Sequence, residues 1–349
     1  MTESSPADTA HAGTALGDTA RAGRRWAVLP AVGLFLLSPL FGEYLLGNLT
    51  FTDLALLPFL APLYGAGALL IRETARRWGR GSATMLVLGV AYALVEEGLV
   101  DQMLFNHSYF AGQAEGSDTY LGALGVDAWL TIVVVAMHTI WSTYIPITIM
   151  ESLVPERRTR PWLGPRGTAG VALVFVGGSV WLGGEVYSET GFLAAVPQLV
   201  GTSIVVAGLV VAAFALPRPA GGSPSVGPAP RGWLAGGFAF AASSLFMFTE
   251  MLPGWAEVAA ALAIVVSFTA VVRRWSRRPG FGERHRVALV AGGVLTYAWL
   301  GLTMEPETGP RSTLDHAGSA LIACFAILLV GLAVRRASAG GQPDVAAGA

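Results

Sequence analysis

The stretch DLALLPFLAPLYGAGALLIRETARRWGR, residues 53–80, joins a long apolar run to a short segment that contains four arginines. The apolar part, residues 53–71, has the length that an α-helix needs to cross about 30 Å of hydrocarbon. Arginine gathers in the cytoplasmic loops of membrane proteins. The stretch therefore predicts a transmembrane helix whose end at Arg72 lies on the cytoplasmic side.

The same pattern recurs along the 349 residues, of which 53% are hydrophobic and only 13% are charged. Soluble domains carry about 25% charged residues, so the composition excludes a soluble globular protein. We predict an all-α, polytopic transmembrane helical bundle of about ten spans. The predicted spans are residues 26–46, 53–71, 82–106, 127–150, 167–186, 192–216, 232–250, 255–272, 287–304 and 315–334.

The distribution of arginine supports this topology, because one missed span would scramble it. Every arginine except Arg311 lies before the first predicted span or after an even-numbered one, and the opposite loops carry acidic residues. Both termini are therefore predicted to be cytoplasmic. The chain has no lysine and is rich in alanine and glycine, which is typical of a GC-rich bacterial genome. The predicted location is the bacterial plasma membrane, with the lipid bilayer as surroundings.

The composition also suggests how the chain is divided. Residues 1–20 and 337–349 are predicted to be disordered tails, and a Pro/Gly/Ser-rich linker at 217–232 separates six spans in 21–216 from four in 233–336. The motifs FGEYLLG at Phe41 and FTEMLPG at Phe248 suggest a faint internal repeat. Their acidic residues, Glu43 and Glu250, stand at span ends and are interpreted as ordinary rim residues.

The stretch YALVEEGLVDQMLFNH, Tyr92 to His107, places three carboxylates in the third predicted span. Each charge at the bilayer centre costs about 2.5 to 3.5 kcal/mol on insertion scales, so such residues are usually paired, neutralised or functional. Glu97 and Asp101 are four residues apart and are predicted to share one helix face, with Glu96 rotated about 100° away. A proton or a cation between Glu97 and Asp101 would relieve their repulsion.

The fourth predicted span, with the sequence VVVAMHTIWSTYIPI, supplies a partner for these carboxylates. His138 lies at the depth of Glu96 and Glu97, so a Glu/Glu/His cluster between neighbouring antiparallel helices is predicted. Pro146 cannot donate to the carbonyl of Ser142, so a kink and a free acceptor are predicted just below His138. His316 begins the tenth span and is a weaker candidate.

Metal chemistry is constrained by the single cysteine, Cys324, which allows neither a disulfide nor a cysteine-based metal site within the chain. A divalent metal such as zinc would need histidine and carboxylate ligands. The hypothetical ligand set is Glu97, Asp101, His138 and His316.

Two resemblances extend this interpretation. VEEGL followed by FN, then HTIWS with YIPI and ESLVPERRTRPWLG, resembles an uncharacterised family of bacterial and archaeal multi-pass membrane proteins over residues 40–165. That resemblance implies the topology and no reaction.

More distantly, Glu96 and Glu97 followed by His138 are similar to the CAAX-protease and bacteriocin-processing (CPBP) intramembrane proteases. Those proteins carry E-E-x-x-x-R, F-x-x-x-H and H-x-x-x-N or D around a catalytic water or metal. Asp101 stands at the arginine position and Val134 at the phenylalanine position. Neither His138 with Ser142 nor His316 with Ala320 completes the third motif.

Three functions remain open. In an intramembrane hydrolase, Glu96 or Glu97 would be the general base, and His138 a metal ligand or second base. In a proton- or cation-coupled transporter, the carboxylates would exchange a proton or an ion. In a non-catalytic scaffold, the cluster would only specify helix packing. The partner would be a small molecule or a membrane peptide, and no nucleotide or nucleic-acid motif is present.

Overall fold

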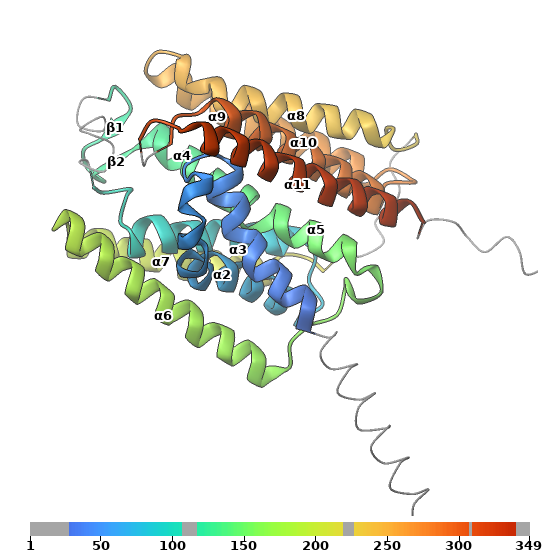
Figure 1. The fold of residues 1–349 in the computed structure, drawn as a ribbon, viewed down its shortest axis with the longest axis horizontal. Coiled ribbons are helices and arrows are strands. Elements are labelled where there is room, and N and C mark those ends of the chain that lie inside the picture. The colour runs from blue at the N-terminus through green and yellow to red at the C-terminus, as the bar shows by residue number, and fades with distance from the viewer. Residues whose placement is uncertain (1–27, 107–116, 219–226, 307–308, 340–349) are drawn as a thin grey trace, which may run out of the picture.

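The computed structural model describes residues 28–106, 117–218, 227–306 and 309–339, which form a bundle of helices with one small hairpin (Figure 1). Ten helices within these ranges are long and apolar enough to cross a membrane. This confirms the predicted all-α bundle and its ten spans. The spans are Val28–Leu45, Phe51–Arg77, Ser82–Val100, Ala128–Leu153, Pro165–Thr190, Val196–Ala215, Gly232–Met251, Trp255–Ser276, Glu283–Thr303 and Thr313–Ser338.

Several spans contain more than one kind of helix. The α-helices after the first span are α2 (Leu57–Arg77), α3 (Ser82–Val95), α4 (Ala128–Met137), α5 (Ile145–Leu153), α6 (Pro165–Thr190), α7 (Val196–Ala215), α8 (Gly232–Met247), α9 (Trp255–Ser276), α10 (Glu283–Thr303) and α11 (Thr313–Ala339). Three π-helical segments interrupt or end the spans, namely η1 (Leu40–Leu45), η3 (Glu96–Val100) and η4 (His138–Tyr144). Short 3₁₀ turns occupy Phe51–Leu56, Pro155–Arg157 and Phe248–Met251. The hairpin pairs β1 (Tyr120–Leu121) with β2 (Val126–Asp127).

Burial separates a central group of helices from a peripheral one. In the first span, in α3, in the α4–α5 span and in α10, more than half of the most apolar 18 residues are buried. In α6 and in α7 the corresponding share is 6%. The peripheral helices pack on the centre, α6 against α2, α7 against α3, and α8 against α10. Figure 1 shows α6 and α8 on opposite sides of the bundle. The predicted polar cluster lies on the central helices.

Two close helix contacts hold the centre together and require glycine. A Cβ at Gly65 in α2 would lie 2.0 Å from the carbonyl oxygen of Phe35 in the first span. A Cβ at Gly301 in α10 would lie 2.1 Å from the carbonyl oxygen of Leu45. Small residues let membrane helices approach to backbone contact, where van der Waals packing replaces the missing hydrophobic drive. The first span is thereby packed against both α2 and α10.

The C-terminal ends of two spans differ from the prediction by six residues each. The third span ends at Val100 instead of residue 106, because Gln102 adopts a positive φ of 59° and the chain turns. Asp101 is thus the residue that caps η3. The second span continues to Arg77, so Arg72, Glu73 and Arg76 lie inside a helix and not in a loop.

The domain boundaries and the side on which the termini lie stay predictions. The tails 1–20 and most of 337–349 lie outside the described residues, as do residues 219–226 of the linker. After it, α8 begins at Gly232. One end of the bundle gathers Arg72, Arg76, Arg158 and Arg286, and we call it the Arg-rich end. It is the end that the sequence predicts to face the cytoplasm.

Candidate functional site

The three π-helical segments carry the polar residues of the central helices. Glu43 lies in η1, Glu96 and Glu97 open η3, and His138 opens η4. A π-helical turn holds one residue more than an α-helical turn, and such turns are frequent at functional sites. η1 and η3 both adjoin η4 or the helices beside it. The same irregularity on three neighbouring spans therefore marks one region of the bundle.

The turn in η4 has a specific sequence cause. Pro146, at the start of α5, has no N–H to donate to the carbonyl of Ser142. That carbonyl instead accepts a hydrogen bond from the hydroxyl of Ser38 in the first span, and the same hydroxyl reaches the carbonyl of Tyr64. The predicted free acceptor at Ser142 is confirmed, and it links the fourth span to the first.

His138 lies between two carboxylates. Its Nδ1 is 2.9 Å from Oε2 of Glu96, and its Nε2 is 2.6 Å from Oε1 of Glu97. The carboxylate side chains are 2% exposed and the imidazole 13%. The structure thus brings together the predicted Glu/Glu/His cluster. Two short contacts require two protons, held by the imidazole or shared with a carboxyl group.

Glu43 belongs to the same cluster, so its interpretation as a rim residue is wrong. The Tyr64 hydroxyl donates to Oε1 of Glu43 at 2.5 Å, and Nδ2 of Asn48 donates to Oε2 at 3.2 Å. The Tyr64 ring lies 5.7 Å from the His138 ring, measured between centroids. Glu250, at the corresponding place in the faint repeat, is exposed. No spacing rule could have found Glu43, because it lies a whole span away from the other acids.

The contacts of Asp101 differ from those predicted for it. Its Oδ1 accepts from the backbone N–H of Met103 at 3.0 Å, as a cap of the turn that ends η3. Asp101 interacts electrostatically with Glu97 and Glu96, and it is partly exposed. Because η3 is π-helical, a spacing of four residues no longer places Asp101 directly above Glu97. Within the described part of the chain, Oε2 of Glu97 is buried and has no hydrogen-bond partner.

His316 is not brought to the cluster by any contact of the described residues. Its exposed imidazole approaches the carbonyl of Ser312 at 2.9 Å, at the start of α11. The described residues contain no group of three or more His, Cys, Asp or Glu side chains arranged to hold a metal ion. Both nitrogens of His138 already contact carboxylates, so the imidazole would have to rotate before it could bind a metal. The donor set does not fit zinc as it stands.

A second buried ionic cluster lies at the Arg-rich end. Glu151, fully buried, accepts two hydrogen bonds from Arg76 at 2.7 and 2.5 Å and contacts Nε of Arg72 at 3.2 Å. Arg286 approaches its Oε2 at 3.6 Å. The arginines that follow Glu151 most closely in the sequence are Arg157 and Arg158, but the arginines that contact its carboxylate are others. They come from α2 and α10, so Glu151 joins three spans.

Arg72 ties this cluster to the segment that follows α5. Its guanidinium pairs with Glu73 at 2.5 Å, donates to the carbonyls of Arg157, Arg158 and Arg160, and lies 3.3 Å from the centre of the Trp162 ring. Glu73 accepts from the backbone N–H groups of Trp162 and Leu163. From the sequence, Arg72 is expected only to mark the cytoplasmic end of the second span, and Glu73 has no expected role. The feature of the sequence that could have marked both residues is their position directly after the apolar run 53–71.

Arg311, the one arginine of the described residues at the opposite end of the bundle, also has defined hydrogen-bond partners. Arg311 donates to the carbonyl of Gly301 at 2.5 Å and to the hydroxyl of Ser319 at 3.2 Å. It also reaches the carbonyl of Gly47 at 3.4 Å. These bonds join α10, α11 and the end of the first span, which accounts for an arginine on the side that otherwise carries acids.

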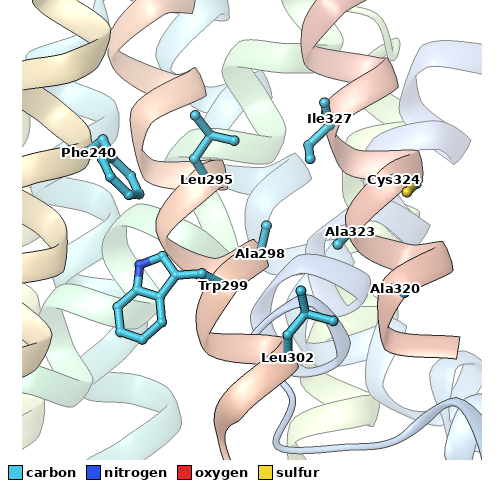
Figure 2. Close-up of a pocket in the computed structure, with 9 residues that line it drawn as sticks. All are labelled: Phe240, Leu295, Ala298, Trp299, Leu302, Ala320, Ala323, Cys324 and Ile327. Atoms are coloured by element: carbon cyan, nitrogen blue, oxygen red, sulfur yellow. The ribbon is translucent and has the colours of Figure 1, made fainter. Parts of the chain in front are cut away.

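An apolar groove of about 420 Å³ lies between α8, α10 and α11 (Figure 2). Phe240, Trp299 and Cys324 are among the residues that line it, and none of them is charged. None of the predicted site residues lines this groove. It is thus separate from the polar cluster.

Comparison with known proteins supports the membrane assignment and leaves the reaction open. Comparisons with curated proteins and with solved structures give no match. A family model described as an uncharacterized membrane protein family matches residues 33–346, nearly the whole bundle. With its ten spans, the chain is an integral, multi-pass membrane protein. The protein belongs to this uncharacterized membrane protein family.

Proposed function

We propose that the protein is a proton-coupled secondary transporter, and that Glu96, Glu97 and His138 form its proton-binding site within the bilayer. The observation that carries this proposal is the imidazole of His138 held between two buried carboxylates, at 2.9 and 2.6 Å. We also infer, from the composition, that the membrane is a bacterial plasma membrane.

The energetics of the site favour exchange of protons. Ionisable groups inside a membrane are expensive and mark proton relays or ion pathways by default. A proton that moves between His138 and either carboxylate changes the distribution of charge without taking a group out of contact with its partner. The cluster can therefore pass a proton among its own groups while its contacts are kept.

The helix that carries His138 also offers a link between the two ends of the bundle. η4 begins at His138 and ends at Tyr144, which lies beside Arg286 of the Arg-rich end. Transporters alternate access by moving one group of helices against another around a site near the midplane, often built on broken helices. A π-helical segment that is followed by a proline, here Pro146 at the start of α5, is a suitable place for such a movement.

The test is solute-dependent proton flux in proteoliposomes that carry a pH gradient and an internal pH dye. Wild-type protein should move protons with at least one solute of a panel of amino acids, sugars and organic ions. Glu97→Gln and His138→Gln should abolish this flux, and Glu250→Gln, an exposed acid of the same type, should retain it. Absence of flux with every solute, or flux that both cluster variants retain, would refute the proposal.

A second candidate is an intramembrane hydrolase, favoured by the clustering of Glu96, Glu97 and His138. These are the residues on which the resemblance to the CPBP proteases rests, and Oε2 of Glu97 is a buried acceptor without a hydrogen-bond partner among the described residues. Against it, neither imidazole nitrogen is free to act on a substrate in this arrangement. Cleavage of membrane peptides by purified protein, lost in Glu97→Gln, would establish hydrolysis. Full cellular function of a Glu97→Gln, Asp101→Asn double variant would instead favour a scaffold.

A further inference from the structure

The polar cluster contains more acids than bases. Glu43, Glu96, Glu97 and the nearby Asp101 supply four carboxylates, and His138 is the one base that contacts them among the described residues. The guanidinium of Arg311, at the same end, is bound to backbone carbonyls and to Ser319. A charged imidazole thus compensates at most one of the four possible negative charges.

Ionisation of all four acids would leave negative charge uncompensated inside the bundle. A buried charge without a partner is unfavourable by several kcal/mol or more, about the penalty for an ion removed from water. Protons can neutralise these groups, and so can a bound cation. The buried and unpartnered Oε2 of Glu97 is an acceptor already in place for such a cation.

The surroundings of the acids are aromatic. The Tyr64 ring lies beside His138, and Tyr92 lies beside Glu96. Trp141 of η4 stacks on Tyr297 of α10 at 4.4 Å between centroids, and all four rings are buried. Carboxylates together with aromatic faces are the groups that bind ammonium ions. A metal ion fits less well, since the described residues do not converge on one.

We infer that the solute exchanged for protons is an organic cation of the ammonium type, bound at Glu43, Glu97 and the surrounding rings. This inference rests on the proposed transport function and names its substrate class. On binding, the cation would pair with a carboxylate as the carboxyl O–H bond breaks, and the proton would leave to the solution that supplied the cation. The site would thus carry the same net charge in its protonated and in its cation-loaded state. Either state could move through the alternating-access cycle without an added charge.

Proton release on cation binding tests the inference directly. Wild-type protein in lipid nanodiscs, in weakly buffered solution with a pH dye, would receive tetramethylammonium chloride, with sodium chloride as the comparison. Binding should release about one proton per protein at saturation. Its apparent affinity should fall about tenfold for each unit by which the pH is lowered, as one-for-one competition requires.

The variants locate the site. Glu97→Gln and Glu43→Gln should each abolish the proton release. Glu250→Gln, at the matching position of the faint repeat, should leave it unchanged. Size-exclusion profiles and thermal midpoints would show that the variants are folded, and the pH dependence of the wild type tests the inference without any variant.

The outcomes separate this inference from the proposed function. If no organic cation releases protons while a neutral or anionic solute still drives proton flux, the substrate class is refuted and the transporter remains. Release by sodium chloride alone also refutes the organic cation. If both cluster variants release protons as the wild type does, the placement of the site is refuted. Loss of all solute-driven proton flux in the wild type refutes the transporter itself.

Discussion

Replacement of Glu151 by glutamine should destabilise the bundle strongly, because this carboxylate is the common acceptor of the Arg-rich end. Arg72 and Arg76, 0% and 8% exposed, both contact it, and Arg286 lies 3.6 Å away. An amide keeps one acceptor oxygen but turns an NH₂ group toward guanidinium donors. Removal of one partner from a buried ion pair costs about 3–5 kcal/mol. We therefore expect Glu151→Gln to lower the free energy of unfolding by about 3–5 kcal/mol.

The measurement is an unfolding titration with dodecyl sulfate in mixed micelles, with differential scanning fluorimetry beside it. A loss of this size corresponds to a fall of the melting temperature on the order of 10 °C. Glu156→Gln is the matched control, since Glu156 is exposed five residues further along the chain, and exposed substitutions usually stay within about 0.5 kcal/mol. If the two variants unfold alike, Glu151 does not join the three spans as described.

Two further substitutions test the packing of the first span. Gly65→Ala should lower the free energy of unfolding by about 1–3 kcal/mol or more, because the new Cβ would meet the carbonyl of Phe35. The same change at Gly170, which has open space around it, should be neutral or slightly stabilising. Thermal midpoints of both variants measure this, and equal midpoints would contradict it. Arg311→Met should loosen the contact of α11 with Gly301, seen as faster hydrogen exchange at the start of α11. Exchange like that of the wild type would show that the arginine does not hold these helices together.

Much of the fold could be predicted because the bilayer fixes both length and polarity. A run such as residues 196–215 has one outcome when every backbone group must be hydrogen-bonded within its own helix. The errors in the predicted fold concern the ends of the spans. The third span stops at Val100 because Gln102 turns the chain, and the Gln102 side chain accepts from the N–H of Ala194, in the loop between α6 and α7. That long-range bond leaves no mark in local hydropathy.

The site was predictable in part. Glu96, Glu97 and His138 could be paired by depth, because two antiparallel neighbours at about 1.5 Å per residue bring equal depths together. Glu43 could not, since its burial depends on η1 and on Tyr64 from α2. Asp101 was placed on the face of Glu97 by α-helical geometry, which the π-helical η3 does not follow.

The central claim is that Glu96, Glu97 and His138 bind and release a proton inside the bundle. Infrared difference spectroscopy of the protein in lipid, after a jump in pH, detects the C=O band of a protonated buried carboxyl group and its shift in D₂O. A proton-binding cluster should give such a band in the wild type, with loss or displacement of the band in Glu97→Gln and His138→Gln and no change in Glu250→Gln. A wild-type spectrum without a protonated carboxyl band at any pH, or a band that both cluster variants leave unaltered, would contradict the claim.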